Sequence, residues 1–346
     1  MAPIYPSRIN DIAHLETLLS EPTPHAIETL ATLDGDLMLL GVAGKMGPTL
    51  AQMARRGYEA AGVRRRVIGV ARFSEPGSED RLRSQGIETI RCDLLDPTQV
   101  AQLPDVANVI SMFGMKFGST GQESRTWAMN ALVPAYVCDR FRRSRIVAFS
   151  TGNVYGLTPV AFGGSREFDP LAPSGEYAMS CIGRERIYEY HARTHNIPMA
   201  LLRLNYATEM RYGVMVDIAT KVLAGQSIDL SMGHFNAIWQ SDANAAALSA
   251  FAYLSNPPTV WNLAGPETLS VRRVAEAFAA ILGKTAHFTG TESADAFLSN
   301  AQLSHSLLGY PRVSASQMIA WIADWITRGG VTLGKPTHFE DRKGKY

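Results

Sequence analysis

A four-residue apolar run, followed by three glycines and a helical repeat, constrains the fold of this chain more than any other feature. Residues 37–40 are LMLL, a composition typical of a strand buried on both faces of a sheet. Gly41, Gly44 and Gly47 then mark a turn, and the residues after it repeat apolar side chains at helical spacing. A strand, a glycine turn and a helix N-terminus direct backbone N–H groups toward one point, which suits a dinucleotide pyrophosphate. The spacing is GxxGxxG rather than GxGxxG, so the same glycines also fit a plain tight turn.

Composition and charge exclude several classes of protein. The 346-residue chain is 46% hydrophobic and 19% charged, which is ordinary for a globular protein. Its net charge of +1 provides no electrostatic footprint for nucleic acid or an anionic membrane. Three cysteines without CxxC spacing and scattered histidines predict neither a disulfide framework nor a metal site. No apolar run is long enough to span a membrane and no signal peptide is evident, so we expect a cytoplasmic protein.

Short apolar runs alternate with helical patterns through the first two thirds of the chain. Strands are predicted at 37–40, 66–72, 106–114 and 198–205, within 87–96, and in 145–156, where the strand continues into a loop. Such alternation is typical of an α/β protein with a doubly wound, parallel, Rossmann-type sheet, whose ligand binds at the carboxyl ends of the strands.

Changes in composition and hydrophobic pattern divide the chain into four parts. Residues 1–35 predict a helical extension, because two helical stretches are separated by EPTP. Residues 36–205 predict an NAD(P)-binding Rossmann domain, and 206–330 predict a smaller α+β substrate-binding domain interleaved with it. Residues 331–346 form a polar, basic tail.

Several motifs recur in a characteristic order. Thr151 lies three residues before Val-Tyr-Gly, and Tyr177 opens a helix 26 residues later. Asn130 follows the fourth predicted strand, and LLRLNYA occupies 201–207. With the glycine turn, these motifs resemble the extended short-chain dehydrogenase/reductase superfamily, the group of NAD(P)-dependent sugar epimerases and dehydratases, over roughly residues 36–330.

The resemblance implies a catalytic set of Thr151, Tyr177, Asn130 and the position four residues after the tyrosine. In that family the threonine hydroxyl holds the substrate oxygen, and the tyrosine exchanges a proton with it as hydride moves to or from the nicotinamide. A lysine four residues on lowers the phenol pKa, because it brings a positive charge to the same helical face. Here that residue is Cys181, whose thiol supplies no positive charge.

Three interpretations follow from this cysteine. The positive field can come from nicotinamide or from another cation, such as Arg184 or Lys116. Alternatively, an acidic substrate, an epimerisation or an elimination makes strong activation of the tyrosine unnecessary. Finally, the chain can be a non-catalytic dinucleotide-binding sensor or interaction protein. Cys181 itself is either a small buried hydrophobe or, without a histidine nearby in sequence, a poorly activated nucleophile.

The cofactor-binding residues are predicted from the glycine turn and the strand ends. They are Gly41, Gly44, Lys45, Met46, Gly47, Arg72, Asp93, Leu94, Ser111 and Met112. The second strand ends in an arginine rather than a carboxylate, which favours NADP(H), although the same site can accept NAD(H).

The substrate of such a protein would be a sugar, sugar acid or nucleotide sugar. The predicted substrate residues are Asn205, Glu209, Arg211, Trp239 and Gln240. Trp239 could stack on a sugar face, although a tryptophan in such a strand is also a common core residue. The resemblance further implies a homodimer, with a small molecule as its other partner.

Overall fold

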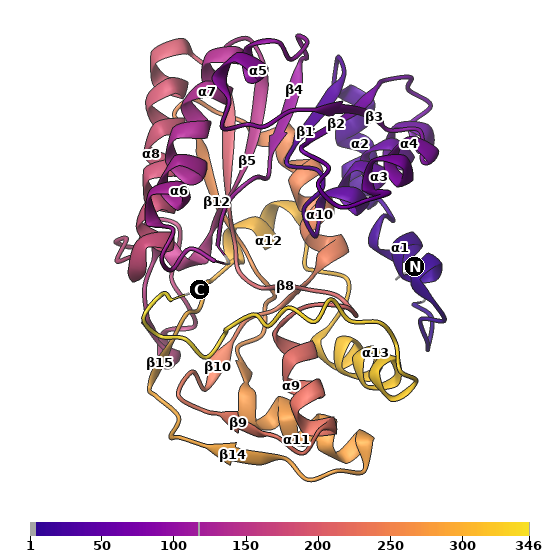
Figure 1. The fold of residues 1–346 in the computed structure, drawn as a ribbon, viewed down its shortest axis with the longest axis vertical. Helices are drawn as coiled ribbons and strands as arrows, with labels where there is room; N and C mark the ends of the chain where they lie inside the picture. Colours follow the sequence, from indigo (N-terminus) through magenta and orange to yellow (C-terminus); the bar gives the residue numbers. More distant parts are fainter. Residues whose placement is uncertain (1–4, 117, 346) are drawn as a thin grey trace.

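A computed structural model describes residues 5–116 and 118–345 of the chain. Figure 1 shows a larger part built around a sheet and a smaller part below it, with the C-terminal tail crossing the junction. No helix in the described residues is long and apolar enough to cross a membrane.

The larger part is organised by a seven-stranded sheet in which every neighbouring pair of strands is parallel. The order is β12-β7-β5-β4-β1-β2-β3. The bounds are β1 (Leu37–Leu40), β2 (Val67–Ala71), β3 (Glu88–Arg91), β4 (Asn108–Ser111), β5 (Arg145–Thr151), β7 (Met199–Leu204) and β12 (Thr259–Leu263). The predicted α/β fold with a Rossmann-type parallel sheet is therefore confirmed. The strand order reverses between β1 and β4, which opens a crevice at their carboxyl ends.

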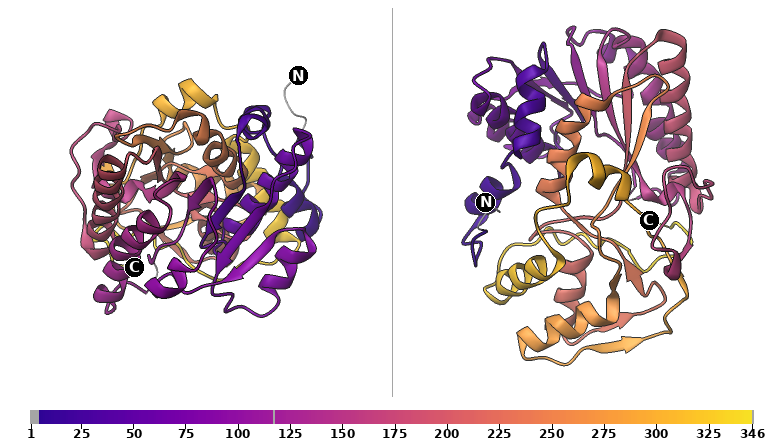
Figure 2. Two further views of the ribbon diagram at one scale, coloured as in Figure 1. Left: turned by 90° about the horizontal axis from the view of Figure 1, so that it is seen from above. Right: turned by 180° about the vertical axis from the view of Figure 1, so that it is seen from behind.

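The central strand β1 is buried on both faces, as its composition predicts. Leu37 and Leu39 belong to one hydrophobic cluster, and Met38 and Leu40 belong to another. This alternation follows from the two-residue period of a strand, which sends successive side chains to opposite faces. Helices α2, α3 and α10 cover the first face, whereas α7 and α8 cover the second (Figures 1 and 2).

The helices of the larger part have the following bounds. They are α1 (Ile12–Leu19), α2 (Pro24–Thr32), α3 (Gly47–Ala60), α4 (Ser78–Ser84), α5 (Pro97–Ala101), α6 (Glu123–Trp127), the π-helix η1 (Ala128–Leu132), α7 (Val133–Arg140), α8 (Gly175–His195), α10 (Gln240–Ser249) and α12 (Gln302–Leu308). The first two form the helical extension and are capped by Asp11 and Thr23, whose side chains accept hydrogen bonds from backbone N–H groups.

The smaller part consists of three helices that share one hydrophobic cluster, with short strand pairs around them. The helices are α9 (Val214–Leu223), α11 (Val271–Leu282) and α13 (Ala315–Thr327). The short strands and turns of helix are η2 (Gly152–Val154), β6 (Thr158–Pro159), η3 (Val160–Phe162), β8 (Ala207–Thr208), β9 (Ser227–Asp229), β10 (His234–Phe235), β11 (Ile238–Trp239), η4 (Ala250–Tyr253), β13 (Leu269–Ser270), β14 (His287–Thr289) and β15 (Asp295–Ala296).

Two segments from the second half of the chain return to the larger part. Strand β12 pairs with β7 as the seventh strand of the main sheet, and α10 packs against α2 and α3. The sequence indicated interleaving but placed this strand among the elements of the smaller domain. Strand β12 joins the main sheet because β7 otherwise has an unpaired edge, and an edge strand is not recognisable from the sequence of β12 alone.

The tail after α13 is held to both parts by specific contacts. The Thr337 hydroxyl and backbone N–H both donate to the Asp217 carboxylate of α9, at 2.6 and 2.7 Å. Near its end, Gly344 lies against the backbone of Ser174 and Gly175 at the start of α8. These contacts place the tail across the junction seen in Figure 1.

Candidate functional site

A cleft of ≈ 350 Å³ lies at the carboxyl ends of the strands β1 to β4. Of the ten predicted cofactor residues, six line it. They are Gly41, Gly44, Arg72, Asp93, Leu94 and Met112. The strand order reverses at this point of the sheet, which is where ligands bind in open α/β folds.

The glycines of the turn are required by close packing as well as by conformation. Gly41 has φ +88°, and a Cβ there would lie 3.0 Å from the Phe113 backbone. A Cβ on Gly47, the first residue of α3, would lie 2.1 Å from the Val42 carbonyl oxygen. The turn therefore folds tightly back on itself and brings the α3 N-terminus beside the cleft, in the arrangement that binds anions.

The far end of the cleft holds charged groups of both signs. Arg72 is exposed at the end of β2, and Glu75, which the sequence reasoning did not consider, lines the same cleft. The Asp93 carboxylate accepts a hydrogen bond from the Leu95 backbone N–H at 3.1 Å, so it also stabilises the local turn.

A second pocket of ≈ 210 Å³ continues from the same glycine turn, because Lys45 and Met46 line it directly after Gly44 of the cleft. Thr151 at the end of β5 and Tyr177 in the first turn of α8 both line it. Asn205 and Gln240, both predicted substrate residues, line it as well. The pocket thus brings together residues that lie far apart in sequence.

The Tyr177 hydroxyl is buried and hydrogen-bonded to Thr151. Burial, followed by the neighbouring Cys181 sulfur, raises the pKa of this phenol well above its ordinary value. The phenol is therefore protonated at neutral pH and can donate a proton to a substrate oxygen. To accept one, it needs a nearby positive charge.

Asn130 lies behind the reacting groups and holds a loop in place. Its side chain accepts from the Met115 backbone N–H at 2.9 Å and donates to the Met115 carbonyl oxygen at 3.1 Å. It also donates to the Ser180 hydroxyl at 2.9 Å. Asn130 is fully buried and is not among the residues lining the pocket, so it acts as a positioning residue.

Two lysines make the second pocket basic. The Lys45 Nζ lies 3.2 Å from the centroid of the Tyr212 ring, and the Lys116 Nζ lies 5.8 Å from the centroid of the Tyr177 ring. Burial lowers the pKa of each lysine to about 8, and Lys335 contributes to the lowering at Lys45. No aspartate or glutamate is among the described residues that line this pocket.

Seven predicted site residues are not among those that line the cleft or the second pocket: Gly47, Ser111, Asn130, Cys181, Glu209, Arg211 and Trp239. Trp239 is 1% exposed and packs against Trp321 with ring centroids 5.4 Å apart, because β11 turns it into the core of the smaller part. Glu209 and Arg211 bind each other at 2.9 Å. The Ser111 hydroxyl is buried against the Tyr188 hydroxyl.

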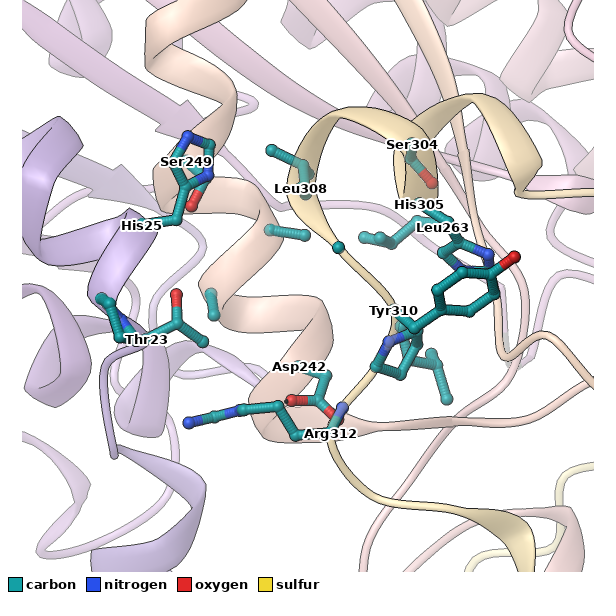
Figure 3. A pocket seen from close by; sticks show the side chains of 16 residues that line it. Thr23, His25, Asp242, Ser249, Leu263, Ser304, His305, Leu308, Tyr310 and Arg312 are labelled. Atoms are coloured by element: carbon teal, nitrogen blue, oxygen red, sulfur yellow. Dashed lines mark hydrogen bonds and ion pairs between the residues drawn. The ribbon is translucent and has the colours of Figure 1, made fainter. Parts of the chain in front are cut away.

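A third cavity of ≈ 300 Å³ lies between the helical extension, α10 and α12 (Figure 3). His25, His305, Tyr310 and the Asp242–Arg312 ion pair line it. None of its lining residues belongs to the two hollows described above, so it is separate from the candidate site.

One cluster in the described residues has the composition of a metal site, and the sequence reasoning missed it. Asp139, His191 and His195 place their ligand atoms within 4.8 Å of one another. The signal was the HARTH segment, since histidines four residues apart share one face of a helix. Arg142 binds Asp139 at 2.7 Å.

Comparisons with known proteins agree with this fold. MoeE5 in complex with UDP-glucose and NAD is similar at 19% identity, with TM-score 0.69 and coverage of 85% of this chain and 99% of that one. The UDP-glucuronic acid 4-epimerase of Bacillus cereus matches at 20% identity and TM-score 0.69, with the same coverage. DesIV, a dTDP-glucose 4,6-dehydratase of Streptomyces venezuelae, matches at 18% identity and TM-score 0.71, covering 85% and 97%.

These likenesses, all below 25% identity, establish the fold. No curated protein matches the sequence. The model of the NAD dependent epimerase/dehydratase family matches residues 37–228, which is more than half of the chain and contains the glycine turn, Thr151 and Tyr177. The chain belongs to the NAD dependent epimerase/dehydratase family.

Proposed function

We propose that this protein is an NAD(H)-dependent enzyme that transforms a sugar nucleotide or a related sugar by hydride transfer. One observation carries the proposal: the Thr151 and Tyr177 hydroxyls are hydrogen-bonded in a pocket that continues from the dinucleotide cleft. Gly41 and Gly47 keep the turn tightly folded, because a Cβ at either would meet the backbone of Phe113 or Val42. The fold of this turn leaves the N-terminus of α3 beside the cleft, where the phosphates of a dinucleotide would bind.

NAD(H), when bound, supplies the hydride donor or acceptor. The residues of this chain orient the substrate oxygen and exchange a proton with it. Thr151 orients that oxygen by hydrogen bonding, and Tyr177 donates a proton to it or accepts one from it. The burial of Tyr177 keeps bulk water from the proton-transfer site. Asn205 and Gln240 offer amide groups to the hydroxyls of the same substrate.

The ligands bound in the similar structures and the charge of the pocket both support a substrate of this class. MoeE5 was solved with UDP-glucose, and the epimerase of Bacillus cereus with UDP-glucuronic acid. Lys45 and Lys116 give the pocket here a basic lining, which favours a substrate with a carboxylate or phosphate. The direct test is to incubate the protein with NAD⁺ and UDP-glucose, UDP-glucuronic acid, dTDP-glucose or free glucuronate. NMR then identifies an epimerised, dehydrated or oxidised product.

A non-catalytic dinucleotide-binding protein is the second candidate function, and Cys181 is the observation that favours it. Burial leaves the phenol pKa high, and the residue one turn away carries no charge. This candidate predicts that NAD⁺ raises the melting temperature while no substrate of the panel is converted.

The choice between NAD(H) and NADP(H) depends on two residues of opposite charge. The similar structures were solved with NAD, so the sequence-based preference for NADP(H) finds no support there. Glu75 can accept from a ribose 2′-hydroxyl, whereas Arg72 can bind a 2′-phosphate. We expect Glu75→Ala to weaken NAD⁺ binding and Arg72→Ala to weaken NADP⁺ binding, each by about tenfold. Calorimetric titration with both dinucleotides measures this, and equal losses for both in either variant would contradict the assignment.

The affinity for NADH is expected to fall as the pH rises through about 8. Burial lowers the pKa of Lys45 to about 8, so its ammonium is charged below that pH and neutral above it. Only the charged form attracts the dinucleotide phosphates beside the glycine turn. Between pH 7 and pH 9 we expect a loss of affinity of about tenfold. Lys45→Met should remove most of this pH dependence, and the exposed Lys284→Met should keep it, as followed by NADH fluorescence.

A further inference from the structure

Arg184 lies on the same face of α8 as the tyrosine and the cysteine that replaces the family lysine. Tyr177, Cys181 and Arg184 are spaced i, i+4 and i+7, and all three are buried. Side chains on a helix tilt toward its N-terminus, so a long side chain at the third position reaches back toward the first two. A cysteine at the middle position is short enough to leave this path open.

The Arg184 guanidinium is fixed by neutral acceptors. Its Nη1 donates to the Phe149 carbonyl oxygen at 3.1 Å, its Nε to the Asn130 carbonyl oxygen at 3.3 Å, and its Nη2 to Asn130 Oδ1 at 2.5 Å. No carboxylate of the described ranges forms an ion pair with it, whereas the neighbouring Glu185 is paired with Arg203 at 2.7 Å. A buried cation is normally neutralised by a partner. Because no carboxylate of the described ranges neutralises the guanidinium, its positive charge can stabilise the ionised forms of nearby side chains.

The Arg184 guanidinium lies against the wall of the dinucleotide cleft. A Cβ on Gly114, which lines that cleft, would lie 2.6 Å from the Arg184 Nη2. After burial, which raises the pKa of both groups, Arg184 is the strongest charge that lowers the pKa of Cys181. It is also the strongest charge that lowers the pKa of Tyr177.

We propose that Arg184 replaces the family lysine as the positive charge that lets Tyr177 exchange its proton. This inference rests on the proposed function. Arginine stays charged at every working pH, so the field at the phenol does not titrate. The charge acts through the tyrosine, and Arg184 is therefore a positioning residue, held in turn by Asn130.

Lys116 is the competing source of charge, and it differs from Arg184 in one measurable way. Its Nζ lies 5.8 Å from the centroid of the Tyr177 ring, but burial lowers its pKa to about 8. Activation by Lys116 would fade as the pH rises through about 8, whereas activation by Arg184 would persist. Several titratable or charged groups surround the phenol. They are Lys45, Lys116, Tyr155, Cys181, Arg184, Tyr206, Tyr212, the Glu185–Arg203 pair and, facing Lys116, Asp341.

The test compares Arg184→Met and Arg184→Gln with a double variant that moves the cation to the family position, Arg184→Met with Cys181→Lys. The glutamine keeps hydrogen-bonding capacity, so it covers the case in which the methionine variant fails to fold. We expect both single variants to lower kcat by about 100-fold, with little change in the Kd for NAD⁺, and to move the pH–rate profile to higher pH. The double variant should recover at least about tenfold of kcat. The exposed Arg186→Met on the same helix should behave as wild type.

A readout that needs no substrate completes the experiment. A near-ultraviolet difference titration against Tyr177→Phe, with NAD⁺ bound, reports the phenol directly, and Arg184→Gln should shift it to higher pH. An unchanged titration and pH–rate profile in folded Arg184→Gln would overturn the inference, as would losses confined to Lys116→Met. The proposed function fails separately, when wild type converts no substrate although NAD⁺ binds. The titration then still decides whether Arg184 acts on Tyr177.

Discussion

Tyr177→Phe is expected to lower kcat by about 10²- to 10⁴-fold while the Kd for NAD⁺ stays within about threefold of wild type. The substitution removes one hydroxyl and keeps the ring, which is 8% exposed and packed against Val154, Tyr155 and Cys181. The protein should therefore remain folded and keep its dinucleotide site. Steady-state kinetics on the substrate found in the panel, with calorimetric titration of NAD⁺, separates the loss of proton transfer from any loss of binding.

Two variants make this result interpretable. Tyr190→Phe removes a hydroxyl from the same helix at a residue that is 62% exposed, and it should leave kcat unchanged. Thr151→Val should lower kcat as well, because the oxygen of the substrate loses its orienting hydroxyl. If Tyr177→Phe kept the wild-type kcat, the tyrosine would not be the acid or base of the reaction, and the proposed mechanism would be wrong.

Arg203→Met is expected to reduce the free energy of unfolding by about 3–5 kcal/mol, the largest effect on stability that we predict. Arg203 and Glu185 form an ion pair at 2.7 Å with side chains only 6% and 5% exposed. Arg203 also donates to the Tyr155 hydroxyl at 2.6 Å and to the Glu167 carbonyl oxygen at 3.1 Å. Removing it leaves the buried Glu185 carboxylate without its counter-ion, with the Ser150 hydroxyl still donating to it at 2.5 Å, and takes one donor from the buried Tyr155 hydroxyl. Urea unfolding measures the change.

The matched control is Arg193→Met on the same helix. Arg193 binds Glu189 at 3.0 Å with side chains 57% and 30% exposed, and such surface pairs contribute at most about 1 kcal/mol. Pairing Arg203→Met with Glu185→Leu should recover part of the loss, because it removes the stranded charge. If Arg203→Met cost no more than the control, the buried pair would be energetically unimportant.

The local elements that build the site could be predicted from sequence because they depend on short-range patterns. The apolar run at 37–40 and the glycines after it could only form a buried strand and a tight turn. Thr151 and Tyr177 were placed correctly at a strand end and a helix start, since both positions follow from motif spacing. The structure brings these two residues together across one pocket.

The positions of three predicted substrate residues could not be read from the sequence, for one physical reason. The sequence shows which side chain a residue has, but it does not show the face of the fold that the side chain joins. Trp239 was expected in a sugar pocket and packs in the core, and Glu209 and Arg211, expected at the substrate, form an ion pair with each other. Short strands such as β11 carry too few residues for their periodicity to indicate which side is buried.

The sequence by itself determined the parallel sheet, the glycine turn and the unusual cysteine after the tyrosine. Only the tertiary structure decided what surrounds that cysteine. It brought the carbonyls of Asn130 and Phe149 to Arg184 and gave that guanidinium no carboxylate partner among residues 5–116 and 118–345. It also placed Lys116 from a separate loop near the same phenol. Electrostatic interactions depend on distance and burial through space, and neither can be read from the order of residues along a chain.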